Sequence, residues 1–293
     1  MEMKKKILFI INPISGIGKQ KKVEQALDMY LQKDKFDFQI SYTSYAHHAT
    51  ALSLAAVLKG FDIVVAVGGD GSINDCVKGL VSTGVTLGIV PAGSGNGLAR
   101  CLNLPLTIES AIKCINNQKS VEIDSINLND TVYASIAGVG FDALIAREFA
   151  KTHTRGFQPY LKLVLQLYPQ YKQQDYTLII DGKEVRTQAL FISFANSTQF
   201  GFNTEIAPNA QLDDGLIDVV IVKKPPLPLL LWTAQLLFFH KFDKSIYVET
   251  YQAKHIVVKN SGETGVNLDG EYTSFEGDLD FSVVPKSLKV IIP

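Results

Sequence analysis

The sequence predicts an α/β protein of two domains, a doubly wound α/β domain followed by an antiparallel β-sandwich domain. In residues 1–120, short apolar runs alternate with amphipathic helical segments, which is the pattern of a parallel sheet covered by helices on both faces. From residue 121 onward, short alternating runs are separated by Asp-Gly and Asn turns, which is typical of an antiparallel sandwich. A length of 293 residues is enough for two domains that each bury a core.

The first half of the chain repeats a strand-then-helix order. The run from Ile63 to Val67 is uncharged and β-branched apart from one alanine, as expected of a strand that is buried on both faces of a parallel sheet. Val23, Ala26 and Leu27 recur at helical spacing. We expect strands at 6–12, 37–43, 63–67 and 86–90, and helices at 19–32, 48–58 and 73–80.

The second half is richer in short strands. We expect strands at 121–128, 131–137, 176–180, 184–194, 216–222, 255–259 and 279–284, and helices at 143–151, 157–168 and 228–239. Asp181 and Gly182 are expected to form an ordinary hairpin turn, because glycine accepts positive φ and Asp tolerates it.

A glycine-rich loop, Gly68-Gly-Asp-Gly-Ser-Ile-Asn74, follows the buried strand at 63–67. Glycines at this place would let a phosphate approach the backbone N–H groups, and the N-terminus of the helix that follows favours an anion. Asp70 among the glycines would repel a phosphate unless a divalent cation lies between them. A sharp strand-to-helix turn explains one Gly-Gly pair equally well, but the carboxylate indicates a metal-nucleotide site.

A second loop of this kind, Pro91-Ala-Gly-Ser-Gly-Asn96, follows the strand at 86–90 and is expected to precede a helix. Two such loops on neighbouring strand ends can hold a triphosphate, and Ser94 and Asn96 supply polar groups that a simple turn does not need. The segment after the first strand is not a P-loop, because Gln20 follows Lys19 where Ser or Thr is needed for the metal. The glycine spacing of a dinucleotide fingerprint is also absent.

Together the motifs resemble those of the diacylglycerol kinase catalytic family, which includes bacterial lipid kinases, sphingosine kinases and ceramide kinases. The resemblance covers nearly the whole chain and rests on Asn12 to Gly16, Gly68 to Asn74, Pro91 to Asn96, Asp214-Gly215 and Asp269-Gly-Glu271. Their order and spacing make the resemblance specific, whereas each motif alone is weak. Two positions depart from the family pattern, since Ser72 stands where Thr is common and Asp75 where Glu is usual.

The resemblance implies a nucleotide-binding domain at 1–120, completed by a last strand at 286–293, and a β-rich lipid-substrate domain at 121–285, with the active site in the cleft between them. It implies ATP and Mg²⁺ as cofactors, with Asp70 holding Mg²⁺ on the phosphates. The implied nucleotide contacts are Asn12, Pro13, Ser15, Gly16, Thr43, Gly68, Gly69, Asp70, Gly71, Ser72, Asn74, Gly93 and Ser94.

The motif Asp269-Gly-Glu271 would be a surface turn in most proteins. By resemblance it supplies the catalytic base, and bacterial members are usually assigned the glutamate, so Glu271 is the first choice. Asp269 stays an alternative, and the two acids could divide base and metal duties. The segment around Asp214 resembles one that binds a structural Mg²⁺, and carried over it gives Gln211, Asp214 and Leu216 as ligands.

The expected activity is transfer of the γ-phosphoryl group of Mg-ATP to the primary hydroxyl of a membrane lipid, with diacylglycerol as the first choice. A sphingoid base and ceramide offer the same hydroxyl and stay alternatives. A kinase for a soluble metabolite on the same fold and a non-catalytic nucleotide- or lipid-binding protein stay alternatives as well.

Composition and charge bear on partners and compartment. A net charge of -1, from 28 basic and 29 acidic residues, gives no reason to expect nucleic acid. The three cysteines have no paired spacing, as expected of reduced thiols in a cytoplasmic protein.

Residues 225–241 are the most apolar stretch, include Trp232 and are too short to span a bilayer, so we expect either a core helix or peripheral contact with the inner face of the membrane. His47 and His48 are expected as capping or surface residues, no histidine is given a catalytic role, and the oligomeric state stays open.

Overall fold

The computed structural model describes residues 4–13, 20–152 and 156–293. The chain divides into two compact units, Met1–Ile123 with Lys286–Pro293, and Asp124–Pro285. The first unit holds a parallel sheet with helices, and the second holds antiparallel sheets, so the predicted fold class is confirmed.

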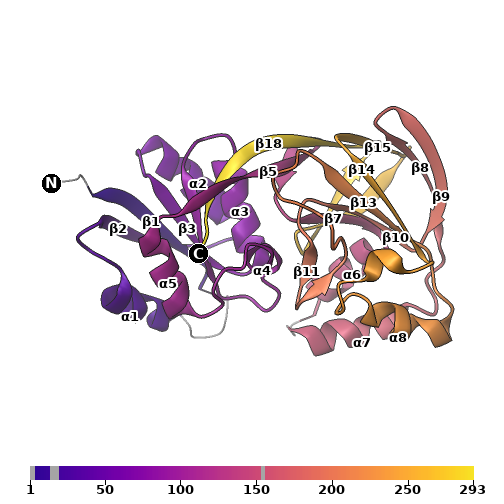
Figure 1. Ribbon diagram of the computed structural model, residues 1–293, viewed down its shortest axis with the longest axis horizontal. Coiled ribbons are helices and arrows are strands. Elements are labelled where there is room, and N and C mark those ends of the chain that lie inside the picture. The colour runs from indigo at the N-terminus through magenta and orange to yellow at the C-terminus, as the bar shows by residue number, and fades with distance from the viewer. Residues whose placement is uncertain (1–3, 14–19, 153–155) are drawn as a thin grey trace. The chain divides into compact units, whose positions relative to one another are not determined.

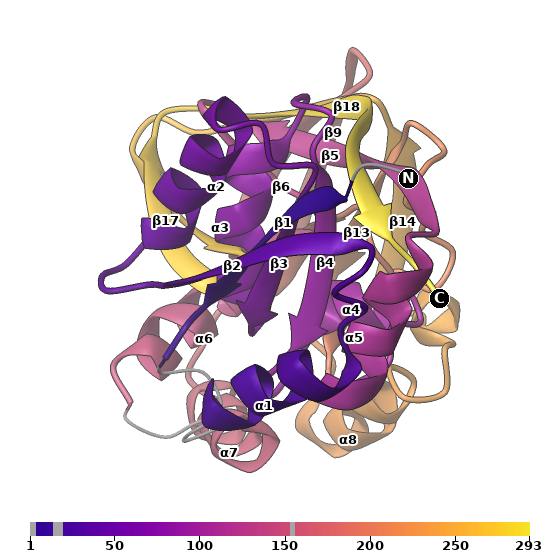
Figure 2. The same cartoon turned by 90° about the vertical axis from the view of Figure 1, so that its left-hand side faces the viewer.

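The first unit is built on four parallel strands in the order β2-β1-β3-β4. Their bounds are β1 Lys5–Ile11, β2 Phe36–Tyr42, β3 Ile63–Gly68 and β4 Thr86–Pro91. Every residue of β3 is buried, as its uncharged β-branched sequence predicts. Figure 2 shows α2 (His48–Leu58) and α3 (Asp70–Leu80) on one face of this sheet, and α1 (Gln20–Tyr30) and α5 (Ile108–Asn117) on the other.

Two features of the first unit differ from the sequence-based expectation. Helix α3 begins at Asp70 and not at Ile73, because Gly69 takes the N-cap position and the glycine-rich motif winds directly into the first helical turn. The segment between the second loop and residue 120 contains two helices, the short α4 (Gly97–Cys101), which was expected directly after the loop, and α5, which was not predicted. Thr107 caps α5 by accepting a hydrogen bond from the Ser110 N–H.

The second unit contains a six-stranded antiparallel sheet in the order β14-β13-β10-β7-β16-β17. A second layer contains β15, β8 and β9 with the first half of β18, and β5 and β6 pair with each other. The Phe194 ring of β10 stacks on the Phe281 ring of β18 with centroids 4.0 Å apart, so the core lies between the layers. The bounds are β5 Ser120–Leu128, β6 Thr131–Tyr133, β7 Ile136–Gly140, β8 Gln174–Ile180, β9 Lys183–Ala189, β10 Phe191–Ala195, β11 Gln199–Gly201, β12 Thr204–Glu205, β13 Ile217–Val222, β14 Val248–Ala253, β15 His255–Lys259, β16 Glu263–Leu268, β17 Glu271–Glu276 and β18 Leu279–Ile291.

Three strand boundaries in the second half were predicted wrongly. The runs at 131–137 and 184–194 are each split into two strands, β6 with β7 and β9 with β10, by short links that redirect the chain to another partner. The expected strands at 279–284 and 286–293 are instead one long strand, β18. Its residues Leu279 to Ser282 pair with β15, and its residues Lys289 and Val290 pair in parallel with β4 of the first unit.

Three helices belong to the second unit: α6 (Phe141–Ala150), α7 (Phe157–Leu167) and α8 (Leu227–Gln235), all visible in Figure 1. Both α7 and α8 contribute side chains to the cluster around Phe141 and Tyr168. Helix α8 is shorter than the predicted helix at 228–239, because the chain turns after Gln235. Among the helices of the described ranges, none combines the length and the apolarity that a bilayer crossing requires.

Candidate functional site

The predicted nucleotide residues that the structure describes gather at the carboxyl ends of β1, β2 and β3. The Asn12 side-chain amide donates to the Ser72 hydroxyl over 3.1 Å, which joins the end of β1 to the first turn of α3. The Thr43 N–H donates to the Ile11 carbonyl over 3.0 Å, so the end of β2 lies beside the end of β1. Pro13 follows Asn12 directly, whereas Ser15 and Gly16 lie outside the described residues.

Asp70 connects the two glycine-rich loops. Its carboxylate accepts a hydrogen bond from the Asn96 N–H over 2.8 Å and another from the Gly97 N–H over 2.7 Å. Burial raises the pKa of Asp70 above its ordinary value, although these two N–H groups and the Arg100 charge act in the opposite direction. The sequence suggested a metal role for this carboxylate and did not predict its role in holding the second loop at the start of α4.

Gly69 and Gly93 face each other across the two loops. A Cβ atom on Gly93 would collide with the Cα of Gly69 and lie 2.9 Å from the Asn96 side-chain oxygen, and a Cβ on Gly69 would lie 3.2 Å from the Cα of Gly93. The Gly68 carbonyl accepts hydrogen bonds from the N–H groups of Ala92 and Gly93. These glycines therefore allow close loop packing, a reason that sequence alone could not separate from phosphate access.

Asn74 is a buried polar side chain of α3 whose amide group lacks partners among the described residues. It is 2 % exposed, and neither its amide oxygen nor its amide nitrogen has a hydrogen-bond partner among the described residues. A buried amide without partners is costly, and such groups in native proteins call for an explanation such as a ligand. Gly71 lies beside it in the first turn of α3, and Ser94 is exposed on the second loop.

The expectation of His47 as a capping or surface residue is confirmed, since its side chain is exposed. His47 occupies the N-cap position with a left-handed backbone, but it makes no side-chain capping bond. Its ring nitrogen Nδ1 instead lies 3.0 Å from a carboxylate oxygen of the buried Asp75. The His48 ring stacks on Tyr45 with centroids 4.2 Å apart.

In the second unit, Asp269 and Gly270 form the two-residue turn between β16 and β17. Leu268 pairs with Glu271 across the turn, and the two turn residues have φ values of 49° and 90°. The Asp269 carboxylate accepts from the Ile136 N–H over 2.7 Å and from the Ala134 N–H over 3.4 Å. The Asp269 N–H also donates to the Ile136 carbonyl over 2.9 Å, so Asp269 fastens the turn to the neighbouring chain.

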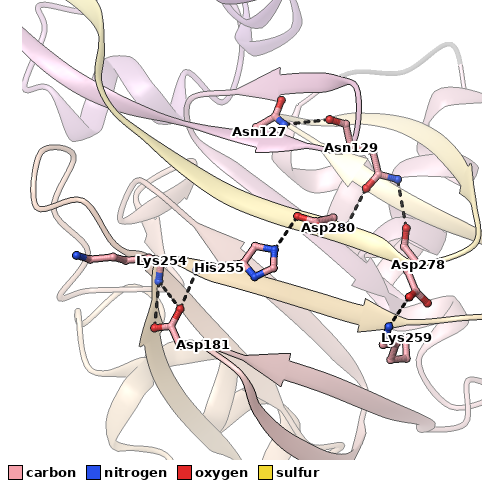
Figure 3. A network of polar contacts seen from close by, with 8 residues as sticks. All are labelled: Asn127, Asn129, Asp181, Lys254, His255, Lys259, Asp278 and Asp280. Atoms are coloured by element: carbon pink, nitrogen blue, oxygen red, sulfur yellow. Dashed lines mark hydrogen bonds and ion pairs between the residues drawn. The ribbon is translucent and has the colours of Figure 1, made fainter.

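The turn at Asp181 and Gly182 provides an internal comparison. It is the hairpin turn predicted from the sequence, with Ile180 paired to Lys183 and φ values of 45° and 81°. Its Asp181 carboxylate accepts from the N–H groups of Lys254 and His255 over 3.1 and 3.0 Å (Figure 3). Asp181 therefore binds a neighbouring strand in the same way as Asp269, which indicates that this mode of contact belongs to the turn.

Glu271 has a different environment from Asp269. It begins β17 and its side chain is exposed, whereas both carboxylate oxygens of Asp269 accept backbone N–H groups. The sequence could not separate the two acids. The geometry favours a structural role for Asp269 and leaves Glu271 as the acid presented by this hairpin.

Two further acids lie near Asp214 of the predicted cation segment, Asp213 within the segment and Asp124 on β5. Asp124 is fully buried, and its carboxylate accepts from the Gly215 N–H over 2.7 Å. Asp214 accepts from the Leu216 N–H over 2.9 Å, while Gln211 is exposed. The pKa of Asp214 is raised by burial first and then by the charges of Asp124 and Asp213. Such hard oxygen groups fit Mg²⁺ or Ca²⁺, and a cation would relieve their repulsion. Asp124 was missed because it lies 91 residues from Gly215 in sequence.

Comparisons with known proteins agree with this arrangement. The model of the family described as the diacylglycerol kinase catalytic domain matches residues 6–128. A second model, described as the YegS C-terminal NAD kinase beta sandwich-like domain, matches residues 135–292. The chain is 28% identical over 298 residues to a diacylglycerol kinase of Mycobacterium tuberculosis, covering 98% of this chain and 95% of the relative.

Another relative and two solved structures extend the comparison. A diacylglycerol kinase of Bacillus subtilis (strain 168) is 29% identical over 275 residues, covering 92% of this chain and 90% of the relative. Two solved structures from Bacillus anthracis str. Sterne have the same fold. One has a TM-score of 0.81 at 22% identity and covers 100% of this chain and 99% of its own. The other, described as a diacylglycerol kinase, has a TM-score of 0.75 at 20% identity, with coverages of 100% and 98%.

The two matched family models together account for nearly all of the chain, and the relatives match along almost its whole length. We conclude that this protein belongs to the diacylglycerol kinase catalytic-domain family.

Proposed function

We propose that the protein is an ATP- and Mg²⁺-dependent lipid kinase that phosphorylates the primary hydroxyl of a lipid, with diacylglycerol as the first acceptor to test. The observation that carries this proposal is the gathering of Asn12, Ser72 and the Asp70–Asn96 pair at one edge of a parallel sheet. In α/β folds of this kind, ligands bind outside the carboxyl ends of the strands. Relatives named diacylglycerol kinase support the choice of acceptor.

The first unit would bind the nucleotide through the residues predicted from the sequence. The buried amide of Asn74 is the strongest candidate for a direct contact, because a bound ligand would satisfy groups that lack partners among the described residues. Ser72 and Asn12 would complete the polar surface, while Gly71 and Ser94 would offer backbone groups. Ser15 and Gly16 belong to the same proposal but lie outside the described residues.

Asp70 would hold Mg²⁺ on the phosphates, directly or through water. Each of its carboxylate oxygens accepts one N–H group and keeps further acceptor capacity. Burial makes the ionised carboxylate costly, as its raised pKa shows, and a nearby cation would offset that cost. When bound, Mg²⁺ would neutralise charge that develops during phosphoryl transfer.

Glu271 would accept the proton of the lipid hydroxyl, and Asp269 would hold the hairpin that carries Glu271. This division of roles follows from the two acids' surroundings, since Asp269 is engaged by the N–H groups of Ile136 and Ala134. Phosphoryl transfer depends mainly on positioning and charge neutralisation, so a rigid hairpin is a suitable support for the base.

The outer surfaces of α7 and α8 would make peripheral contact with a membrane. Leu231 and Trp232 of α8 are 62% and 56% exposed, and Phe239 in the turn after α8 is 65% exposed. Leu161 and Leu165 of α7 add to the exposed apolar groups. Lys162 and Lys241 are exposed beside them, as at the surface of an anionic bilayer. Lys224, by contrast, donates to the Tyr171 carbonyl and helps to hold the chain before α8.

The segment at 211–216 would hold a structural divalent cation, with Asp214 and the carbonyls of Gln211 and Leu216 as ligands. Asp124, which the sequence did not suggest, would complete the acidic set. The test is thermal unfolding with and without added Mg²⁺ or Ca²⁺. Stabilisation that disappears in Asp214→Asn would support the site, and equal stabilisation in both proteins would contradict it.

The activity is tested by transfer of labelled γ-phosphate from Mg-ATP to diacylglycerol, a sphingoid base and ceramide in mixed micelles. We expect labelled lipid from diacylglycerol. Labelled product from another lipid would identify that lipid as the acceptor and would leave the reaction class, a lipid kinase, unchanged. ATP binding without any labelled lipid would contradict the lipid kinase proposal. Transfer to a soluble acceptor in the absence of lipid would replace it with a metabolite kinase.

A further inference from the structure

Asp142 is a buried carboxylate that the proposed reaction does not yet use. It lies in the first turn of α6 and is 6 % exposed. Its Oδ2 atom lies against the Cα of Gly138 on β7, where any Cβ would collide with it. The same oxygen accepts a hydrogen bond of 3.0 Å from the side-chain amide of Asn267 on β16. Asp142 is therefore closely packed against β7 and hydrogen-bonded to β16, the strand that leads into the 269–271 hairpin.

Asn267 links Asp142 to that hairpin. Its amide nitrogen donates to Asp142, and its amide oxygen accepts from the Gly270 N–H over 3.0 Å. An ionised carboxylate can only accept and a backbone N–H can only donate. Both neighbours therefore require the same orientation of the Asn267 amide, and the ionised state of Asp142 fixes which end faces Gly270.

We propose that Asp142 is a positioning residue for phosphoryl transfer, which in its ionised form orients Asn267, holds Gly270 and thereby fixes the direction of Glu271. This inference rests on the proposed function, since it assigns a residue that supports the proposed base. The protonated carboxyl becomes a donor, so it can bond to the Asn267 oxygen and allow the amide to turn away from Gly270.

The turn itself does not need this contact. The hairpin at Asp181 has the same two-residue Asp-Gly turn and the same fastening to a neighbouring strand, yet Ile179 stands at the position that corresponds to Asn267. The chain of contacts from Asp142 through Asn267 to Gly270, here called the clamp, is thus found on the hairpin that carries Glu271 and not on the matched hairpin. That contrast argues for a role in orienting the hairpin rather than in forming it.

The charge balance around Asp142 supports titration close to neutral pH. Burial raises the pKa of Asp142 from 3.8 to about 6, and the Asn267 bond only partly opposes the rise. Tyr160 of α7 faces it and has its own pKa raised, first by burial and then by the Asp142 charge. Of the strands that pack against α6, β7 presents the uncharged Cα of Gly138 to Asp142 and β16 presents the neutral amide of Asn267. A third strand, β17, carries the carboxylates of Glu271 and Glu276. No cation of the described residues acts on Asp142.

The test compares Asp142→Asn, Asn267→Leu and the matched control Asp181→Asn in the full-length protein. The first measurement follows the Gly270 amide by NMR from pH 4.5 to 8, which requires no substrate. We expect the Gly270 signal to titrate with a midpoint of about 6 in the wild type and in Asp181→Asn, and the midpoint to be lost in Asp142→Asn. An unchanged midpoint in Asp142→Asn would overturn the inference.

The second measurement is kcat for phosphoryl transfer over the same pH range. Asp142→Asn is expected to lose the decline near pH 6 and to have roughly threefold lower kcat at pH 7.5, because a neutral acceptor orients Asn267 less strongly. Asn267→Leu is expected to lower kcat about tenfold with an unchanged KM for ATP, as misplacement of a reacting group does. A variant that only loses thermal stability, with kcat and its pH profile unchanged, would contradict the positioning role.

The two measurements separate this inference from the proposed function. If the wild type transfers phosphate to no lipid but Gly270 titrates as expected, the clamp stands and the lipid kinase proposal fails. If the wild type is active and Gly270 does not respond to Asp142→Asn, the kinase proposal stands and the clamp is refuted.

Discussion

The carboxylate of Asp70 accepts the backbone N–H of Asn96 over 2.8 Å, so the first glycine-rich loop directly holds the second. The same carboxylate caps the first turn of α4 through the Gly97 N–H. A residue suggested by its position as a metal ligand is thus also a structural link between two loops.

Asp70→Asn is expected to weaken both functions of this residue. One oxygen becomes an NH₂ group that faces a backbone N–H, so one loop contact is lost at a cost of about 1–3 kcal/mol. The negative charge of the carboxylate, which is proposed to hold Mg²⁺, is lost as well. We expect a lower unfolding temperature and at least a hundredfold lower kcat by coupled ATPase or labelled-phosphate assay. Asp62→Asn is the control, because the Asp62 carboxylate also accepts a backbone N–H, from Lys6, on an exposed part of the same unit. Wild-type kcat in Asp70→Asn would remove Asp70 from the mechanism.

Gly93→Ala is expected to separate the two loops. The new methyl group would collide with Gly69, whose backbone cannot move away as a flexible side chain could. Overpacking of this kind costs about 1–3 kcal/mol, to be measured by denaturant unfolding, and ATP affinity should fall with it. Gly262→Ala is the matched control, since a Cβ there meets nothing within 4 Å. Equal stability of the two variants would show that the loops do not pack as described.

Much of the first unit can be predicted from sequence, because its elements are specified locally. The uncharged β-branched run at 63–67 is a buried strand, and the glycine-rich segment after it leads into a helix. Local pattern also predicted the turn at Asp181, which is confirmed. The boundaries of β18 could not be predicted, because this strand pairs with both β15 and β4 and crosses the polar residues between two apolar runs.

The contacts that define the candidate site join residues far apart in the chain. Asp70 and Gly97 are 27 residues apart, and Asp142 and Asn267 are 125 apart. No local pattern distinguishes an Asp that accepts such bonds from one that faces solvent. The sequence therefore left Asp269 as an alternative to Glu271, the first choice by resemblance, and only the backbone partners of Asp269 separate the two.

Asp142→Asn is expected to stabilise the fold at neutral pH. The folded pKa is raised from 3.8 to about 6, so protonation of Asp142 favours the folded state below pH 4 and this contribution is lost as the pH rises through 6. A shift of this size corresponds to a cost of ~3 kcal/mol for the ionised form above pH 7. The difference in unfolding free energy between Asp142→Asn and wild type should grow from near zero at pH 4 to its full value at pH 7.5. A difference that does not change with pH would contradict the raised pKa.

Trp232→Glu is expected to reduce membrane binding. Trp232 is 56% exposed on α8, and a charge there opposes insertion of the apolar face into the interface. We expect about tenfold weaker binding to vesicles of anionic phospholipid by co-sedimentation, with unchanged ATP binding. Leu58→Glu, at an 89% exposed leucine of the first unit, is the control. Equal vesicle binding by Trp232→Glu and wild type would place the membrane contact elsewhere or exclude it.

The most direct test of the central claim is the rate of labelled γ-phosphate transfer to diacylglycerol, measured in a single turnover for wild type, Glu271→Gln and Asp269→Asn. Removing a general base costs about 10²–10⁴-fold, so Glu271→Gln should lose activity by that factor while keeping its ATP affinity and stability. Asp269→Asn should be less stable, because it weakens the hydrogen bonds that the carboxylate accepts from the Ile136 and Ala134 N–H groups. It should keep more activity than Glu271→Gln. Transfer by Glu271→Gln at the wild-type rate would contradict the account.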